Sequence, residues 1–198
     1  MSLRGAPPGG ATKQSPFTTY LHLLLKWNKA HNLTAITDPG EIKIKHFEDS
    51  LAPLPFLPTP CRLLDIGCGA GFPGIPLKIK RPDLEVVLLD SRRKKTAFCE
   101  AVIRKLDLEE ITAVQGRAED ATVQTKLGRF DAVISRAAFS IAEFLKIARP
   151  YLKKDGVAIA MKSRRWPEEK TILGNWKLKT VFDYELSNDL GRRSLLIF

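Results

Sequence analysis

Residues 61–74 combine an acidic side chain with closely spaced glycines. The stretch reads CRLLDIGCGAGFPG, and its short apolar run carries Asp65 and ends at Gly67. A run of this kind, too short for a helix, is typical of a buried parallel strand. Gly67, Gly69 and Gly71 lack side chains where a backbone must turn tightly and lie against a ligand. We therefore expect a cofactor loop here, with Asp65 at the strand's mouth, where it could face a cationic ligand.

Two classes of cofactor compete for this loop. The dinucleotide pattern G-x-G-x-x-G fits Gly69, Gly71 and Gly74, but this register starts beyond the expected strand end. The better-placed register is D-x-G-x-G-x-G from Asp65 to Gly71. It resembles motif I of the Rossmann-like methyltransferases, which bind S-adenosylmethionine. A dinucleotide needs no acidic group at the position of Asp65, so the methyl donor is favoured.

Further residues with possible roles in chemistry follow the other expected strands. Asp90 ends the apolar run 84–89, where it can accept hydrogen bonds from a ribose diol of either cofactor. The loop at 116–120 follows a third strand and could hold an adenine edge, and Arg136 lies at the tip of a fourth. His46 and Asp49 lie near the end of a helix, either as surface polar groups with a cap or near the cofactor mouth.

The order of expected elements predicts a doubly wound α/β sheet. A helix begins at Ser15-Pro16 and runs to about His31, and a second opens at Asp38, so two helices precede the sheet. The last two strands are separated only by the turn-like segment 187–191, so they must pair antiparallel. We expect strands at 63–66, 84–89, 111–114, 130–135, 156–161, 179–186 and 193–198, and later helices at 72–80, 91–106, 140–152 and 167–175.

Composition narrows the function. The 198 residues carry a net charge of +10 with a pI near 9.7, which favours a polyanionic partner such as nucleic acid. No apolar run is long enough to span a membrane, and no signal-peptide core follows Met1. The three cysteines and three histidines show no metal-type spacing, so we expect a cytoplasmic protein without a metal. Residues 1–16, rich in Gly and Pro, are expected to form a disordered leader.

Longer motifs carry a more specific resemblance. The motifs are WNKAHNLTAI from Trp27 to Ile36, KHFEDSL from Lys45 to Leu51, LLDIGCGAGFPGIPL from Leu63 to Leu77, LLDSRRKK from Leu88 to Lys95, GRAE from Gly116 to Glu119, and FDAVISRA from Phe130 to Ala137. With them, the chain from Phe17 to its C-terminus resembles the RsmG/GidB family, which methylates N7 of a guanine in small-subunit (16S) ribosomal RNA. The resemblance implies a Rossmann-like class I methyltransferase with a seven-stranded, mostly parallel sheet and an antiparallel last strand.

The resemblance assigns roles to individual residues. Gly67, together with Gly69 of the loop, and Phe72 would contact S-adenosyl-L-methionine, and Ala118 and Glu119 would hold its adenine side. Arg136 would lie at the cofactor and target pocket as an orienting residue. We expect one methyltransferase domain, 17–198, with a helical extension at 17–60 and a Rossmann-like core at 61–198, acting as a monomer on 16S ribosomal RNA or the small ribosomal subunit. Candidate phosphate contacts are Arg92, Arg93, Arg164 and Arg165, although the run 92–95 could also be a solvated helix face.

Residue types that are missing agree with this chemistry. Guanine N7 has an in-plane lone pair and loses no proton on methylation, so it needs no general base. A cytosine C5 enzyme would need a cysteine nucleophile, and an amino-methylating enzyme a D/N-P-P-Y/F motif, whereas the fourth strand ends in Ser135-Arg136-Ala137-Ala138. A small-molecule methyltransferase and a non-catalytic RNA-binding or ribosome-assembly factor remain as alternatives, and an NAD oxidoreductase is the least favoured.

Overall fold

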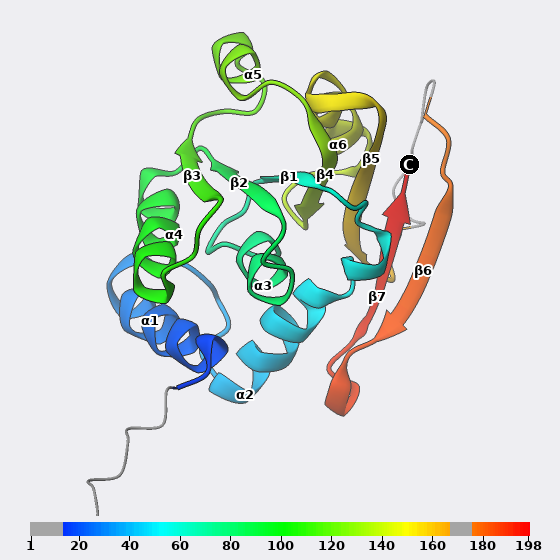
Figure 1. Cartoon of the computed structure of the whole chain (residues 1–198). Coiled ribbons are helices and arrows are strands. Elements are labelled where there is room, and N and C mark those ends of the chain that lie inside the picture. The colour runs from blue at the N-terminus through cyan, green and yellow to red at the C-terminus, as the bar shows by residue number, and fades with distance from the viewer. Residues whose placement is uncertain (1–13, 167–175) are drawn as a thin grey trace, which may run out of the picture.

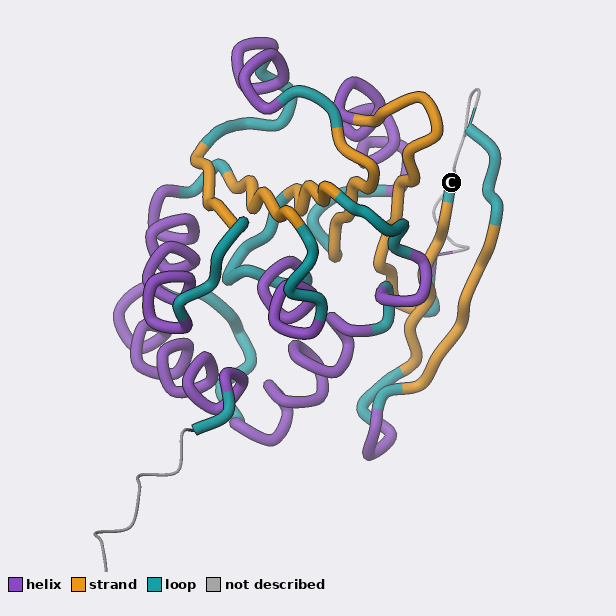
Figure 2. Tube along the Cα trace, viewed as in Figure 1, coloured by secondary structure: helices purple, strands orange, loops and turns teal. Residues whose placement is uncertain are grey.

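The structure, a computed structural model, describes residues 14–166 and 176–198 and contains one seven-stranded sheet. The strand order is β3-β2-β1-β4-β5-β7-β6, and β1 to β5 pair in parallel. Figure 2 shows the strands running through the molecule between helices. The strands are β1 (Arg62–Ile66), β2 (Glu85–Asp90), β3 (Ile111–Gln115), β4 (Phe130–Arg136), β5 (Leu152–Ser163), β6 (Thr180–Glu185) and β7 (Arg192–Ile197).

The C-terminal tail closes the sheet with an antiparallel strand. β7 lies between β5 and β6 and is antiparallel to both. The predicted fold class, with an antiparallel last strand, is therefore confirmed, as is the hairpin formed by the last two strands. The short turn η6 (Ser187–Asp189) joins β6 to β7. The insertion of β7 between β5 and β6 was not predicted, because strand order across a sheet depends on tertiary packing.

Helices cover both faces of the sheet, as Figure 1 shows. Alternate strand residues enter two apolar clusters, since successive side chains point to opposite faces. Leu63 and Leu88 join the cluster that includes residues of α1 (Pro16–His31), α3 (Gly74–Lys80) and α4 (Arg93–Leu106). Leu64 and Leu89 join the cluster on the other face, with α5 (Ala121–Leu127), α6 (Ile141–Ala148) and the turn η4 (Arg149–Tyr151).

The N-terminal extension begins as predicted. The Ser15 side chain accepts a hydrogen bond from the Thr18 N–H at the start of α1, and Asp38 caps α2 (Pro39–Ile42) by accepting from the Glu41 N–H. The helix then continues as the π-helical turn η1 (Lys43–Glu48) and the 3₁₀ turns η2 (Asp49–Leu51) and η3 (Leu54–Phe56).

One helix of the structure was not predicted from the sequence. Helix α5 occupies a stretch where no element was predicted, because its seven residues are too few for a clear apolar period. The helix predicted at 167–175 and most of the predicted leader lie outside the described residues. Within the described ranges, no helix is long and apolar enough to cross a bilayer, and no group of His, Cys, Asp and Glu side chains could hold a metal ion.

Candidate active site

A cavity of about 440 Å³ lies at the carboxyl ends of β1 to β4. This is the edge at which open α/β sheets bind ligands. We call it the cofactor cavity. Six of the seven residues predicted to bind a cofactor line it, namely Gly67, Gly69, Asp90, Ala118, Glu119 and Arg136. The seventh, Phe72, lies in the wall of an adjoining cavity of about 130 Å³ that also touches Gly67, Gly69 and Arg136.

The glycine loop curls over the end of β1. Gly69 and Gly71 have φ angles of +57° and +89°, in the left-handed region that glycine adopts without a steric penalty. A Cβ on Gly69 would find only the Gly67 carbonyl, at 4.0 Å, whereas one on Gly71 would lie 2.8 Å from the Tyr20 hydroxyl. Gly69 therefore leaves open space for a ligand, and Gly71 leaves room for the packing of α1.

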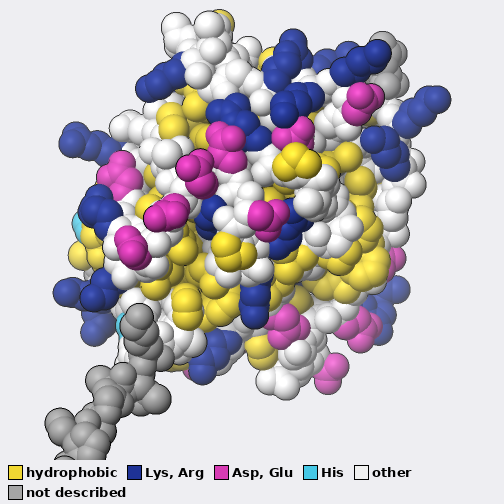
Figure 3. Space-filling model, viewed as in Figure 1, with side chains coloured by type: hydrophobic (Ala, Val, Ile, Leu, Met, Phe, Trp, Pro, Cys, Tyr) yellow, Lys and Arg dark blue, Asp and Glu magenta, His cyan; other side chains and the backbone are white. Residues whose placement is uncertain are grey.

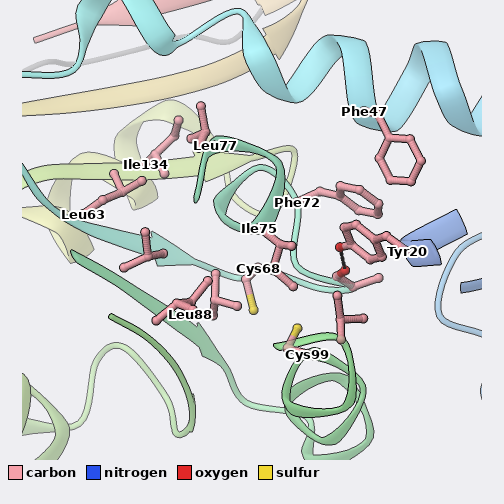
Figure 4. Packing of buried hydrophobic residues seen from close by; sticks show 14 of the residues in the cluster. Tyr20, Phe47, Leu63, Cys68, Phe72, Ile75, Leu77, Leu88, Cys99 and Ile134 are labelled. Carbon is pink, nitrogen blue, oxygen red and sulfur yellow. Dashed lines mark hydrogen bonds between the residues drawn. The ribbon is translucent and has the colours of Figure 1, made fainter. Parts of the chain in front are cut away.

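Tyr20 of α1 packs against the glycine loop. Its buried hydroxyl donates a hydrogen bond to the carbonyl of Ala70, as Figure 4 shows. Its ring stacks on Phe72 with centroids 5.2 Å apart, and Phe72 stacks in turn on His46 at 4.7 Å. The N-terminal extension thus fixes the shape of the loop through one hydrogen bond and a column of rings.

Asp65 lies beneath the loop and does not line the cofactor cavity. Its side chain is fully buried, and Oδ2 accepts a 2.8 Å hydrogen bond from the N–H of Gly74 at the start of α3. Oδ1 has no hydrogen-bond partner among the described residues. Burial raises the pKa of Asp65 to about 7, because the charged form is disfavoured away from water. The expectation that Asp65 faces a ligand is therefore corrected, since its side chain points to the α3 face of the sheet.

Asp90 at the tip of β2 holds two segments of the cavity wall. Oδ2 accepts a hydrogen bond of 3.0 Å from the Gly69 N–H, and Oδ1 accepts one of 2.9 Å from the Arg92 N–H. A carboxylate offers about four lone-pair positions. Asp90 therefore keeps acceptor capacity for the hydroxyl groups of a ribose.

The loop after β3 forms another wall of the cofactor cavity. The Ala118 carbonyl accepts hydrogen bonds from the Tyr151 hydroxyl at 2.9 Å and from the Gln124 side chain at 3.1 Å. Gln124 belongs to α5, so the unpredicted helix helps to hold this loop. The side chain of Glu119 is exposed beside it.

The basic run at the start of α4 divides into two pairs. Lys94 and Lys95 donate hydrogen bonds to backbone carbonyls at the end of α1 and just after it. This pair joins α4 to the end of α1 and is not a free solvated face. Arg92 and Arg93 are exposed, and Arg92 lines the cofactor cavity.

A second cavity, of about 360 Å³, opens beside the first, and we call it the acceptor cavity. Arg136 and Ala137 line both cavities, and Ala137 has a φ of +53°, which is uncommon for a residue with a side chain. The remaining walls come from the N-terminal extension, the end of β5 and β7. They are formed by Ile36, Lys45, His46, Asp49, Met161, Lys162, Ser163 and Arg193.

Arg136 stands between the two cavities and is fixed by the N-terminal extension. Its Nη1 donates to the Lys45 carbonyl at 3.0 Å and to Asp49 Oδ2 at 3.1 Å, and its Nη2 donates to His46 Nδ1 at 3.2 Å. Asp49 is only 4% exposed and also accepts a 2.8 Å hydrogen bond from the Tyr184 hydroxyl of β6. A guanidinium has five N–H groups, so two of them have no partner among the described residues.

His46 is held in one neutral form. Since an arginine can only donate hydrogen bonds, His46 Nδ1 must accept, which leaves the proton on Nε2, 2.8 Å from Thr34 Oγ1. Burial and the nearby charge of Arg136 lower the pKa of His46 to about 3. Of the two interpretations offered for this region, the structure supports the one near the cofactor mouth, because His46 and Asp49 line the acceptor cavity.

The remaining predicted RNA contacts lie beyond both cavities. Arg164 and Arg165 are exposed after the end of β5. Arg164 lines a smaller cavity of about 270 Å³ beside the C-terminal strands, together with Arg192 and Arg193. The structure therefore brings Arg92 to the cofactor cavity but does not bring Arg164 or Arg165 to either of the two cavities.

Comparison with known proteins identifies the family. Residues 13–184 match the sequence model of GidB, described as rRNA small subunit methyltransferase G. The chain belongs to this family. A relative from Lactococcus lactis subsp. lactis (strain IL1403), named ribosomal RNA small subunit methyltransferase G, is 40% identical over 192 residues, which cover 91% of this chain and 80% of the relative. A relative of the same name from Desulforamulus reducens is 46% identical over 156 residues, 77% of this chain and 65% of its own length.

Solved structures agree on the fold of this GidB family member. A methyltransferase from Aquifex aeolicus, described as dependent on S-adenosylmethionine, superposes with a TM-score of 0.61 at 17% identity, covering 84% of this chain and 96% of that one. Fibrillarin from Aeropyrum pernix, solved with natively bound S-adenosyl-L-methionine, superposes with a TM-score of 0.54 at 16% identity, covering 69% and 65%. The fold is thus that of the Rossmann-like methyltransferases.

The cofactor cavity of this GidB family member fits S-adenosylmethionine in two respects. The open space beside Gly69 gives a ligand close access to backbone, and Asp90 offers free acceptor positions to a ribose. No phosphate-binding arrangement is required, because this cofactor has no phosphate.

Sequence reasoning did not single out Tyr184 and Arg193, which carry no local motif.

Proposed function

We propose that this chain uses S-adenosylmethionine to methylate N7 of a guanine in the 16S ribosomal RNA of the small ribosomal subunit. Family membership supports the RNA substrate. The structural observation that carries the proposal is the pair of adjoining cavities that share Arg136 and Ala137. A donor in one cavity and an acceptor in the other would meet at that shared wall.

In this proposal the cofactor cavity fixes the methyl donor. Gly67 and Gly69, with Phe72 in the adjoining wall, would hold its amino-acid end, Asp90 would accept hydrogen bonds from its ribose, and Ala118 and Glu119 would hold its adenine. When bound, the cofactor supplies a methyl group activated by a sulfonium. Arg136 orients donor and acceptor from the shared wall.

Transfer to N7 suits the groups around the shared wall. Bound S-adenosylmethionine would offer its methyl group to the N7 lone pair, and N7 has no proton to lose in such a transfer, so the protein need not supply a general base. Both ring nitrogens of His46 are occupied, and its pKa of about 3 makes it a poor base near neutral pH. The protein's contribution is then proximity, orientation and the field of fixed charges.

The net positive charge of the chain supports an RNA partner. Since that RNA belongs to ribosomes, we place the protein in the cytoplasm. The chain carries 32 Lys and Arg against 22 Asp and Glu. On the face in Figure 3, cationic side chains are spread among acidic ones, so net charge attracts RNA without marking one docking patch there. Arg92, Arg93, Arg164 and Arg165 are the proposed phosphate contacts.

The test is to map methyl groups on RNA. Small subunits and naked 16S ribosomal RNA lacking the modification are incubated with enzyme and cofactor, and nucleosides are identified by mass spectrometry. We expect N7-methylguanosine at one position. A methyl group at another atom would overturn the N7 assignment. Tight RNA binding without any mark would favour the assembly-factor alternative, and a mark on neither RNA nor subunit, with no RNA binding, would favour a small-molecule substrate.

A further inference from the structure

We propose that the acceptor cavity is the pocket for the target guanine, turned out of its RNA stack, with Arg136 and Arg193 directed at its O6. This inference rests on the proposed function. It adds a site for the target base, names the atom of the base that the protein recognises, and assigns a role to the C-terminal strands.

The position and size of the acceptor cavity suit a single base. It shares the wall formed by Arg136 and Ala137 with the cofactor cavity, and its volume of about 360 Å³ lies in the usual range for small-molecule pockets. Enzymes that modify a base must bring it out of the stack and hold its faces between apolar side chains. Ile36, Ala137 and Met161 supply apolar surface here.

The charges in the acceptor cavity match one edge of guanine. Guanine presents two neighbouring acceptors, O6 and N7, and arginine often binds both. Here N7 must stay free to attack the methyl group, which leaves O6 for the donors. Arg136 has two unpaired N–H groups among the described residues. Arg193 donates from Nη1 to the Arg192 carbonyl at 3.1 Å and approaches Asp49 only at 3.9 Å, which leaves further N–H groups for a ligand. Adenine carries an amino donor in place of O6, so two cations at this position select guanine.

Asp49 holds these cations and does not bind the base. Its carboxylate accepts hydrogen bonds from Arg136 and from the Tyr184 hydroxyl, and Arg193 lies beside the same oxygen as Tyr184. In the sheet register, Arg193 is directly opposite Tyr184 on one side and Ser163 on the other. Side chains directly opposite in antiparallel strands share a face. Ser163, Arg193 and Tyr184 therefore lie on one face of the sheet, and the first two line the acceptor cavity.

A bulky side chain placed at the exposed side of the acceptor cavity should block the cavity. Ser163 is exposed and lines the acceptor cavity but not the cofactor cavity. We expect Ser163→Trp to lower methylation of small subunits at least about tenfold, through a higher KM, while the Kd for S-adenosylhomocysteine stays within about twofold. Thr180→Trp places the same side chain at an exposed position of β6 outside both cavities and serves as the control.

A charge-matched pair tests the reading of O6. Arg193→Met is compared with Arg192→Met, whose side chain pairs with Glu185 and lies outside the acceptor cavity. Both variants lose one positive charge, so any general loss of RNA attraction is equal. We expect Arg193→Met to lower kcat/KM by about tenfold or more relative to Arg192→Met, as when one hydrogen-bond donor to a base is removed.

The outcomes separate this inference from the proposed function. If wild-type enzyme marks guanine N7 but Ser163→Trp matches Thr180→Trp and Arg193→Met matches Arg192→Met, the acceptor cavity is not the base pocket and the activity still stands. If Ser163→Trp also abolishes binding of S-adenosylhomocysteine, the two cavities are not separate sites and the inference fails. If wild-type enzyme methylates no RNA, this result contradicts the proposed function on which the inference rests.

Discussion

The two cavities are built in different ways from the same sheet. The cofactor cavity comes from four loops in succession along the parallel strands, and its groups are largely backbone held by Asp90 and by glycines. The acceptor cavity draws side chains from the N-terminal extension, β5 and the antiparallel tail. In the proposed function, the donor would therefore be held by loops that the fold supplies repeatedly, and the acceptor by the N-terminal extension and the C-terminal strands.

The cavities also differ in their buried titratable groups. Beneath the cofactor loop, burial raises the pKa of Asp65 to about 7. Beside the acceptor cavity, burial and Arg136 lower the pKa of His46 to about 3. Both shifts favour a neutral side chain, so around neutral pH the charge near the acceptor comes from the cations and Asp49. The two groups give stability opposite dependences on pH.

Removal of Arg136 should have the largest effect, because this residue belongs to both cavities. We expect Arg136→Ala to lower kcat/KM by about 100-fold or more and the free energy of unfolding by about 3 kcal/mol, since Asp49 loses its buried partner. Steady-state kinetics and urea unfolding measure the two effects. Arg136→Lys keeps the charge but not the planar fork, and full activity in this variant would contradict an orienting role.

A pH-dependent difference in stability should follow from Asp65→Asn. Because the folded pKa of about 7 exceeds the ordinary value of 3.8, Asp65 contributes stability below pH 4 that is lost as pH rises toward 7. Relative to wild type, the variant should gain up to about 4 kcal/mol between pH 4 and pH 7. His46 has the opposite dependence, but it is present in both proteins and cancels.

Urea unfolding of cofactor-free protein at several pH values checks this prediction. A difference between variant and wild type that is constant from pH 4 to pH 8 would show that Asp65 titrates normally. It would then contradict the description of Asp65 as a buried carboxyl group beneath the loop.

Tyr20→Phe should weaken the cofactor side alone. The substitution removes the hydroxyl that donates to the Ala70 carbonyl and keeps the ring stack with Phe72. Loss of one buried hydrogen bond costs about 1–3 kcal/mol. We expect a Kd for S-adenosylhomocysteine about five- to tenfold higher by calorimetry, with little change in KM for small subunits. Leu25→Ala, a partly buried change elsewhere on α1, serves as a control for general loosening. An equal rise in Kd in that control would remove the specific role of the hydroxyl.

The smallest effect is expected at the outer cations. Substitution of both Arg164 and Arg165 by alanine should lower the slope of log affinity against log salt by about 1 for each phosphate that the protein no longer neutralises. Binding to ribosomal RNA is measured across a range of salt concentrations. An unchanged slope would exclude these two residues from the phosphate contacts.

Sequence reasoning located residues that line the cofactor cavity because their signals are local. An apolar run followed by Gly67 and Gly69, an acidic residue at Asp90, and the short link between the last strands each reflect neighbouring residues or a connection length. The helix starts at Ser15 and Asp38 were found in the same way, and their side chains cap helices as expected.

The acceptor half could not be derived in this way. Asp49 and Tyr184 are 135 residues apart and meet only because β7 enters the sheet between β5 and β6, which brings β6 to the N-terminal extension. The direction of Asp65 was missed for a related reason. Strand alternation says that neighbours point to opposite faces, but which face holds the ligand depends on where the loops turn.

The division of labour between the cavities is tested most directly by one calorimetric comparison. The Kd of S-adenosylhomocysteine is measured for Asp90→Asn, in the wall of the cofactor cavity, and for Arg193→Met, in the wall of the acceptor cavity. The account predicts a rise of about tenfold or more for the first variant, since hydrogen bonds donated to a charged carboxylate are replaced by weaker ones to a neutral amide, and a change below about twofold for the second. Equal changes in the two variants, or the larger change in Arg193→Met, would contradict it.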